Sequence, residues 1–511
     1  MNYYKSAASR TAFMFVCLML ANLFGYLSRG LLTRVLTPAE FGLFYSVLTF
    51  FYFLVALIDF GFGRALIKYI SHYKALKKYN ELYSCVAIVA IIRFSLSIIT
   101  GVFLIASSTF LAKYYFKTPA AAGLLKLAAV AILVWYLWVM IDTIFAGFQR
   151  MYAVGLLNLS WKLVFFVAIL GFVFFTSLRG ATMAMCAFIV GLSSFVLFLS
   201  PTKQVFANLT LPLKLSSVLL RKLTMFALPA MLNSFGSMIV GYLDVMMLTY
   251  FRTYPEVGVY NVVLPTALIL THLGTSIAIV LFPMVSELWA KGNKKRLAQG
   301  LRLLYKYSPF IVVPGALTLF VYPDFVLKYL FGTSYASGSL ALVVFGYTFA
   351  SGPLALQIIS IGIIMSTLYL VNSSVLGGIG VPIENTKVLI PAAVFNFILN
   401  LFLIPKFGIV GAAFSTTLSY ILMVVLSIIK VKRFISFSLP WSDWLKIITC
   451  GAIFLLTILF LNRWLVLNLY LKVALSVIAS GVVYLLSAIL LGLVKLEDLT
   501  QFPLLKSLLK R

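Results

Sequence analysis

The chain has 511 residues, of which 63% are hydrophobic and only 10% are charged, and its mean hydropathy is +1.09. A water-soluble domain contains about 45–50% apolar residues, so this composition excludes a soluble enzyme or binding module and predicts an integral membrane protein. The formal net charge of +28 comes from cations spread through short loops, which favours anionic membrane lipids over nucleic acid as the counter-charge.

Apolar runs of roughly twenty residues can cross a bilayer as α-helices, whereas barrel strands would be about ten residues of alternating character. We therefore predict an all-α integral membrane fold with about fourteen transmembrane helices. The first run is too long for a signal-peptide core, and we expect it to be retained as helix one. In chain order, the predicted helices cover residues 11–32, 41–63, 82–109, 122–146, 155–178, 180–200, 224–250, 257–285, 305–330, 350–377, 386–405, 409–430, 443–465 and 470–494.

A duplicated motif follows the first and the seventh predicted helix. Residues 32–48, LTRVLTPAEFGLFYSVL, recur at 248–264 as LTYFRTYPEVGVYNVVL, with seven identical positions. Both copies contain Thr-x-x-Glu, which predicts a capping box where a helix begins, with ligand contact as the alternative. An internal repeat in a membrane chain is typical of transporters built from two matching bundles around a central path.

The repeat predicts two six-helix lobes. Residues 1–200 would form the first lobe with helices one to six, and residues 224–430 the second with helices seven to twelve. A cytoplasmic linker at 201–223 would join them, and residues 431–511 would add helices thirteen and fourteen and a cytoplasmic tail. Because six is even, both lobes enter the membrane the same way up, which makes the repeat parallel. The excess of Lys and Arg on alternate loops predicts that both termini are cytoplasmic.

A second repeat is local and lies before helix ten. Phe331-Gly332 and Phe345-Gly346 each begin a stretch that continues through Ala-Ser-Gly to Leu-Ala-Leu. The pattern indicates a tandem duplication within 331–356, whose extra copy is a candidate for a surface helix. It suggests no function.

Several further stretches, in a characteristic order and spacing, carry a resemblance to a known family. They are residues 28–30, 36–42, 58–63, 145–150, 242–247, 256–260, 282–292, 396–400 and 404–413, the last reading IPKFGIVGAA. The chain resembles the polysaccharide transporter family, the O-antigen and lipid-linked oligosaccharide flippases of the superfamily that includes MATE drug exporters and lipid II flippases. The resemblance implies a MATE-like fold in which two six-helix lobes enclose a cavity, two extra carboxyl-terminal helices, and alternating access.

Ionisable side chains inside a span are costly, so they usually face a protein interior or a water-filled path. Arg29, Arg93 and Lys162 are candidates to bind an anionic lipid diphosphate, with snorkelling to a membrane interface as the alternative for each. His272 is a further candidate that would titrate near neutral pH, or else an interhelical hydrogen-bond donor.

The acidic residues in or near spans are candidates for gating or coupling. Asp59 precedes Arg64, and Asp142 precedes Arg150, so we expect ion pairs at helix ends or an inner gate, with proton carriage as the alternative. Asp244 has no cation within one turn of its helix, and we expect it to pair across helices or, alternatively, to couple to a cation.

Catalytic and metal-binding patterns are missing from the sequence. Cys17, Cys85, Cys186 and Cys450 lie in separate apolar runs, without the spacing of a metal site or a disulfide framework. No grouping of Ser, His and Asp, glycine-rich phosphate loop or metal cluster is present, so an integral membrane glycosyltransferase or polymerase is the weakest hypothesis. We predict a protein that is not an enzyme and has no cofactor, apart from an unidentified coupling ion, Na+ or H+.

These observations predict a flippase of the cytoplasmic membrane that moves a polyprenyl-(di)phosphate-linked oligosaccharide to the outer leaflet. Its expected partners are the lipid-linked oligosaccharide, anionic lipids and polysaccharide-assembly membrane proteins, without nucleic acid. The alternative is an ion-coupled MATE-type exporter of small molecules, because the fold would be the same. The sign of the charged side chains that line the cavity discriminates between the two functions. A cation exporter needs carboxylates there, whereas helix one offers Arg29 and no acid.

Overall fold

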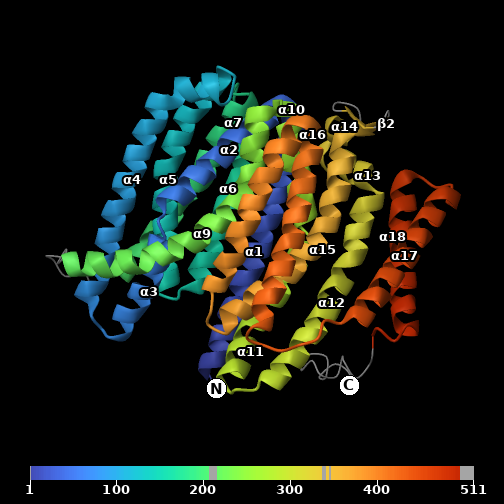
Figure 1. The fold of residues 1–511 in the computed structure, drawn as a ribbon. Helices are drawn as coiled ribbons and strands as arrows, with labels where there is room; N and C mark the ends of the chain where they lie inside the picture. Colours follow the sequence, from blue (N-terminus) through green and yellow to red (C-terminus); the bar gives the residue numbers. More distant parts are fainter. Residues whose placement is uncertain (1, 207–215, 337–340, 345–346, 495–511) are drawn as a thin grey trace. The chain divides into compact units, whose positions relative to one another are not determined.

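The computed structural model describes residues 2–206, 216–336, 341–344 and 347–494 (Figure 1). Its contacts divide the chain into two compact units. Unit 1 comprises Met1–Val262, Leu330–Tyr335 and Asn400–Ile409, and unit 2 comprises Val263–Tyr329, Ala336–Leu399 and Val410–Arg511. The predicted lobe boundaries stay a prediction, and parts of the predicted linker and tail, residues 207–215 and 495–511, lie outside the described residues.

The described chain is almost entirely helical, as predicted. Its helices are α1 (Asn2–Val35), α2 (Pro38–Ile58), α3 (Phe62–Ala75), α4 (Tyr79–Tyr114), α5 (Ala120–Gly147), α6 (Met151–Phe175), α7 (Gly180–Leu192), the 3-10 helix η1 (Ser193–Phe198), α8 (Leu199–Val205), α9 (Ser217–Phe251), α10 (Tyr254–Leu268), α11 (Thr271–Ala290), α12 (Lys294–Val321), α13 (Pro323–Phe331), α14 (Thr333–Ala336), α15 (Ser351–Gly378), α16 (Ile383–Lys432), α17 (Trp441–Trp464) and α18 (Leu469–Leu490). Two short strands, β1 (Ala341–Val344) and β2 (Tyr347–Ala350), complete the elements.

Within the described residues, 11 helices are long and apolar enough to cross a membrane, or up to 12 if the bent pair α10 and α11 forms one span. The number fourteen therefore stays a prediction. The 50 residues of α16 cover two of the predicted spans. A straight helix of that length would reach about 75 Å, more than twice a bilayer core of about 30 Å. The chain interrupts α16 at Gly408, where φ is 56° and ψ is −132°.

Three local differences separate the structure from the predicted elements. The second predicted helix, 41–63, ends at Ile58, because Gly61 has a φ of 76° and begins a new helix, α3. The eighth, 257–285, is broken between α10 and α11 with a bend of 44°. The surface helix suggested for the extra copy of the tandem repeat is wrong where β1 and β2 pair antiparallel, whereas Thr333–Ala336 and the residues from Ser351 are helical. Residues 337–340 and 345–346 lie outside the described residues.

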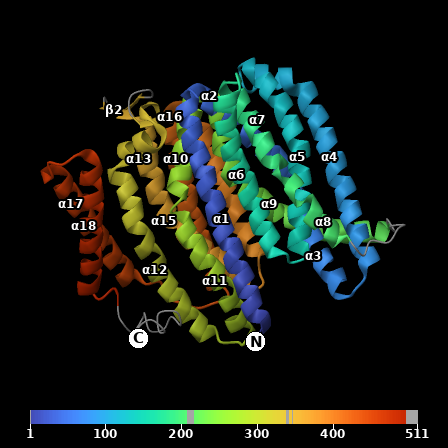
Figure 2. The same cartoon turned by 180° about the vertical axis from the view of Figure 1, so that it is seen from behind.

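Each unit has its own packing. In unit 1, α1 packs along α6 and α4 along α5 (Figures 1 and 2), and Phe41, Phe44 and Phe51 of α2 are 0% exposed. In unit 2, α15 packs against α11 and α12, and α17 packs against α18 and α12. The Tyr484 hydroxyl of α18 donates a hydrogen bond to the Phe310 carbonyl of α12 (2.9 Å), which fixes the carboxyl-terminal pair on unit 2.

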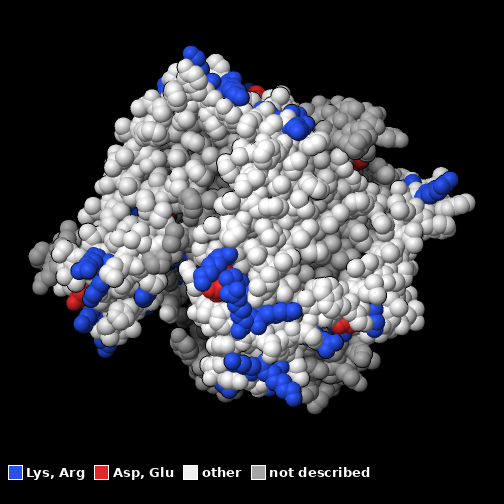
Figure 3. Space-filling view, in the orientation of Figure 1, with Lys and Arg blue, Asp and Glu red and all other residues white. Residues whose placement is uncertain are grey.

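The helix surfaces agree with a lipid environment. Large apolar side chains are exposed along α4, α17 and α18, among them Phe103, Leu456 and Ile478. On the face drawn in Figure 3, Lys and Arg side chains lie near helix ends, and long stretches of helix surface between them carry no charge. Apolar side chains without a protein partner are stable in contact with lipid, so the chain is a multi-pass membrane protein.

Candidate functional site

The capping box predicted for the duplicated motif is confirmed in its first copy. At the start of α2, the Thr37 hydroxyl accepts a hydrogen bond from the Glu40 amide (3.3 Å), and the Glu40 carboxylate accepts one from the Thr37 amide (2.9 Å). In the second copy, Glu256 is only 6% exposed and forms an ion pair with Arg252 (2.9 Å between Oε2 and Nε). Each motif glutamate accepts a hydrogen bond from the motif threonine hydroxyl, Glu40 from Thr37 (2.9 Å) and Glu256 from Thr253 (3.4 Å), and the second copy adds the ion pair with Arg252.

Arg29 lies on α1 where α1, α2 and α10 meet. Its Nε donates a hydrogen bond to the Tyr45 hydroxyl (3.2 Å), and its terminal guanidinium nitrogen donates one to the Asn261 carbonyl (2.8 Å). The guanidinium carbon is 4.7 Å from the centre of the Tyr45 ring, within the range of a cation–π contact. The described residues provide no carboxylate within ion-pair distance of Arg29, so its charge is held by neutral groups.

Lys162 of α6 faces the same side of α1. Its ammonium group lies 3.8 Å from the centre of the Trp161 ring, and a Cβ atom added to Gly25 would come within 3.5 Å of Nζ. Gly25 and Arg29 are four residues apart and therefore share one face of α1. Nowhere in the described chain does Lys162 have a hydrogen-bond or ion-pair partner. Two unbalanced cations consequently lie along one face of α1.

A row of aromatic rings extends from this lysine across unit 1. Trp161 contacts Trp138 edge to face (ring centres 6.2 Å apart), Trp138 stacks on Trp135 (5.5 Å), and Trp135 contacts Tyr52 (5.6 Å). Tyr52 in turn stacks on Tyr242 of α9 at 6.0 Å. The sequence analysis missed this row. Its signal is the spacing of Trp135 and Trp138, which places two large amphipathic rings on one helix face.

The third candidate cation, Arg93, is neutralised. Its side chain is 3% exposed and forms an ion pair with Asp59, whose side chain is 36% exposed. A terminal nitrogen of Arg93 also lies 3.4 Å from the Thr143 hydroxyl. The ion pair corrects the partner expected for Asp59, which is Arg93 of α4, whereas Arg64 is exposed. The buried Arg93 side chain also disfavours snorkelling, the alternative to headgroup binding.

The pair expected between Asp142 and Arg150 is also wrong. Asp142 of α5 accepts a hydrogen bond from the Asn158 side chain of α6 (3.1 Å). Arg150 instead donates to the Pro201 carbonyl (3.3 Å). Asp142 therefore fixes α5 against α6 through a neutral donor.

Asp244 pairs across helices, as expected. It is 2% exposed on α9, and its two carboxylate oxygens accept hydrogen bonds from the Tyr260 hydroxyl of α10 and the Asn400 amide of α16, each at 2.7 Å. Because buried carboxylates are stable only when their oxygens have donors, this residue ties three helices of unit 1 together.

We expect Tyr260→Phe to lower the free energy of unfolding by about 1–3 kcal/mol, because it removes the hydroxyl that donates a hydrogen bond to the buried Asp244 carboxylate. Asp244→Asn retains one acceptor oxygen, and its cost should not add to that of Tyr260→Phe, since both changes break the same contact. Unfolding of the single and double variants in mixed detergent micelles measures this coupling. Strictly additive costs would contradict the shared contact.

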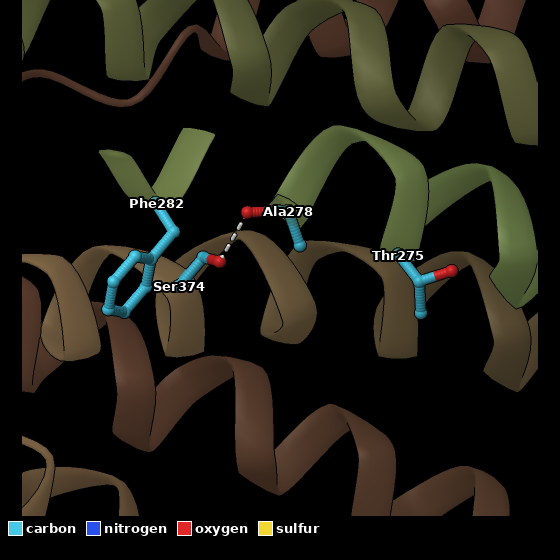
Figure 4. Close-up of a pocket in the computed structure, with 4 residues that line it drawn as sticks. All are labelled: Thr275, Ala278, Phe282 and Ser374. Atoms are coloured by element: carbon cyan, nitrogen blue, oxygen red, sulfur yellow. Dashed lines mark hydrogen bonds between the residues drawn. The ribbon is translucent and has the colours of Figure 1, made fainter. Parts of the chain in front are cut away.

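His272 lies in unit 2 and is exposed in the first turn of α11, just after the break that separates α10 from α11. One turn further, Thr275, Ala278 and Phe282 of α11 line an open groove of about 550 Å³ together with Ser374 of α15. Figure 4 shows the Ser374 hydroxyl bonded to the Ala278 carbonyl (2.7 Å). The groove offers few polar groups. No cluster of three His, Cys, Asp or Glu that could hold a metal occurs among the described residues.

The chain is similar in sequence to a family of membrane proteins and to two archaeal relatives. Residues 8–289 match the family described as polysaccharide biosynthesis protein. The chain is 30% identical over 475 residues to an uncharacterized membrane protein of Methanocaldococcus jannaschii, covering 90% of this chain and 91% of that one. It is 23% identical over 223 residues, 44% of each chain, to a probable low-salt glycan biosynthesis flippase of Haloferax volcanii.

Solved structures share the fold. The chain superimposes on the lipid II flippase MurJ in an inward closed conformation with a TM-score of 0.74 at 15% identity, covering 93% of this chain and 97% of that one. For an inward-facing MATE family multidrug transporter, the TM-score is 0.64 at 14% identity, with 84% and 98% covered. These likenesses confirm the predicted MATE-like fold and concern the fold alone.

Proposed function

Because the chain belongs to the family of polysaccharide biosynthesis proteins, within the flippase superfamily that shares the MATE-like fold, we propose that it moves a polyprenyl-(di)phosphate-linked oligosaccharide across the cytoplasmic membrane. Transport would proceed by alternating access of the two predicted lobes, with both termini cytoplasmic. Polysaccharide-assembly enzymes of the same membrane would supply and consume the glycolipid.

One observation carries this proposal: Arg29 and Lys162 lie along one face of α1 without a carboxylate partner in the described residues. Two unbalanced cations in a span are expensive unless an anion joins them. A guanidinium can bind two oxygens of a phosphate group at once, and an ammonium adds a compact point charge. A diphosphate between α1 and α6 would satisfy both groups.

The aromatic row suggests where the rest of the headgroup lies. Trp135 and Tyr52 are half-buried and combine apolar ring faces with polar edges, which suits contact with amphipathic sugar rings, whereas Trp161 and Trp138 are buried and connect them to Lys162. The charge pattern disfavours the alternative of a cationic drug exporter, because Asp59 is paired with Arg93 and Asp142 is bonded to Asn158. We further propose that transport is coupled to Na+ or H+, and the dependence of the transport rate on an imposed gradient of either ion tests this.

Neutralising either cation should slow transport by roughly ten- to a hundredfold, since a hydrogen bond to a charged group contributes about 1.5–3 kcal/mol and 1.4 kcal/mol is tenfold. The variants are Arg29→Gln and Lys162→Met in the full chain, reconstituted in vesicles with a fluorescent isoprenoid diphosphate disaccharide. Appearance of the probe in the opposite leaflet gives the rate. Arg29→Lys, which keeps the charge but not the planar fork, should be intermediate.

Two exposed cations provide matched controls: Arg463→Gln on α17 and Lys126→Met on α5 remove the same charges and should leave the rate unchanged. A cationic dye should not be transported. If the double variant Arg29→Gln/Lys162→Met flips the probe at the parental rate, the cationic site is wrong. Efficient dye export would favour the small-molecule exporter instead.

A further inference from the structure

The two copies of the duplicated motif pack against each other within unit 1. A Cβ atom added to Gly42 of α2 would lie 1.9 Å from the Tyr254 carbonyl oxygen and 2.9 Å from the Gly258 amide nitrogen. In the reverse direction, a Cβ atom added to Gly258 of α10 would lie 2.6 Å from the Pro38 carbonyl oxygen. Only glycine permits this backbone approach, and Gly42 and Gly258 occupy the same position in the two copies.

Arg29 bridges the same two helices one turn further along. Its acceptors, the Tyr45 hydroxyl and the Asn261 carbonyl, belong to residues that each follow a motif glycine by three positions. The Thr249 hydroxyl of α9 adds a direct bond to Ser46 of α2 (2.9 Å). The contact between α2 and α10 is thus held by glycine packing and by the two hydrogen bonds of the Arg29 side chain, whereas the Ser46–Thr249 bond holds α2 against the last turn of α9.

We propose that the contact of Gly42 with Gly258 is a closure between α2 and α10 and that Arg29 is its latch, released when a bound phosphate or diphosphate takes over the guanidinium donors. This rests on the proposed function, because it deepens the role of Arg29 in headgroup binding. A charged oxygen is a stronger acceptor than a tyrosine hydroxyl or a peptide carbonyl. The anion therefore competes with Tyr45 and Asn261, and its binding weakens the bridge.

The course of α10 supports a moving contact. The helix passes from unit 1 to unit 2 between Val262 and Val263, directly after the acceptor Asn261, and it ends at Leu268 before the 44° bend. α10 is therefore one of the segments that would have to accommodate a displacement of one unit against the other, together with the later crossings around residues 330, 335, 400 and 409. A latch next to this junction would link headgroup binding to that displacement.

A reversible crosslink tests the closure. Ser46→Cys with Thr249→Cys joins the two copies of the motif, because it links α2 to the last turn of α9, directly before α10. The pair replaces two buried hydroxyls that lie 2.9 Å apart, close enough for a disulfide after small adjustments. The native cysteines, all free, are first replaced by alanine: Cys17, Cys85, Cys186 and Cys450. Oxidation with a membrane-permeant reagent should slow flipping of the fluorescent probe at least tenfold, a reductant should restore it, and the single-cysteine variants should be unaffected. Normal flipping by the crosslinked chain, or failure of the pair to oxidise, would overturn the closure.

The latch is tested separately by the rate at which the disulfide between the two introduced cysteines forms. This rate is measured with and without farnesyl diphosphate, the anionic probe. Farnesyl diphosphate should slow disulfide formation several-fold in the chain with Arg29 and have no effect after Arg29→Gln, whereas farnesol should have no effect on either. Binding of the probe is followed separately. If it binds through Arg29 but leaves crosslinking unchanged, the latch is wrong and the proposed function stands. If it does not bind, the proposed function fails, and the latch fails with it.

Glycine substitution separates a closure from static packing. Gly42→Ala pushes α2 away from α10, so the Tyr45 and Asn261 acceptors compete less with the anion for the Arg29 guanidinium. The affinity for farnesyl diphosphate should therefore rise several-fold. Gly123→Ala, at a position with nothing within 4 Å, is the matched control and should leave the affinity unchanged. Reduced or unchanged affinity in a folded Gly42→Ala protein would contradict the latch.

Discussion

Asp59→Leu is expected to lower the free energy of unfolding by about 3–5 kcal/mol, whereas Arg93→Met should cost only about 1–3 kcal/mol. The difference follows from what each change leaves behind. Without Asp59, a guanidinium with a 3% exposed side chain remains charged and uncompensated. Without Arg93, the remaining carboxylate is 36% exposed and can be hydrated.

The double variant Asp59→Leu/Arg93→Met should be more stable than Asp59→Leu alone, because apolar replacement of a whole buried pair is often neutral. The Arg93 Nε atom is already buried without a hydrogen-bond partner, which limits what the intact pair contributes. Unfolding in mixed detergent micelles measures all three variants. Glu287→Gln, in an exposed pair with Lys291 on α11, is the control and should cause no measurable change. A smaller cost for Asp59→Leu than for Arg93→Met would contradict this account.

The helices were predictable because membrane spans depend on average hydropathy over about twenty residues. The breaks were not, because they depend on single backbone conformations. Phe60 and Gly61 have φ values of 45° and 76°, and they end α2 inside a stretch that is apolar apart from Asp59 and a few hydroxyl residues. By contrast, the interruption of α16 at Gly408 falls between two predicted spans, 386–405 and 409–430.

Partners within the site were less predictable than the candidates themselves. Sequence proximity suggested pairs of Asp59 with Arg64 and of Asp142 with Arg150, but only residues three or four apart face each other on a helix. The actual partners, Arg93 and Asn158, lie on the neighbouring helices α4 and α6. Tertiary packing brings them together, and a single sequence carries no direct signal of it. The unbalanced cations, Arg29 and Lys162, were identifiable because charge inside an apolar run is visible in the sequence.

The duplicated glutamates show a symmetry that sequence alone did not reveal. Glu40 lies against Gly180, which has a φ of 70° and begins α7, and a Cβ atom there would be 2.8 Å from the carboxylate. Glu256 lies against Gly408, with φ 56°, where the corresponding distance is 2.3 Å. In each half, the motif glutamate thus occupies the space beside a left-handed glycine at the start of a later helix segment. The motif fixes two helix starts at once, which explains its repetition better than capping of one helix.

Gly408→Ala should therefore lower the free energy of unfolding by roughly 2–6 kcal/mol, the sum of backbone strain and overpacking. The φ and ψ at Gly408 resemble the first central position of a type II′ turn, which glycine occupies. The added methyl group would also meet the Glu256 carboxylate, which cannot move freely because it is buried and paired with Arg252. Arg252 in turn donates to the Pro405 carbonyl (3.3 Å), one turn before the break.

Gly481→Ala on α18 is the matched control, because nothing lies within 4 Å of its added methyl group. Alanine has the higher helix propensity, so this variant should be as stable as the parent or up to about 1 kcal/mol more stable. Thermal unfolding and detergent titration of both variants provide the comparison. Equal stability of Gly408→Ala and Gly481→Ala would mean that the break in α16 is not fixed by its glycine, and that the Arg252–Glu256 pair does not hold the turn in place.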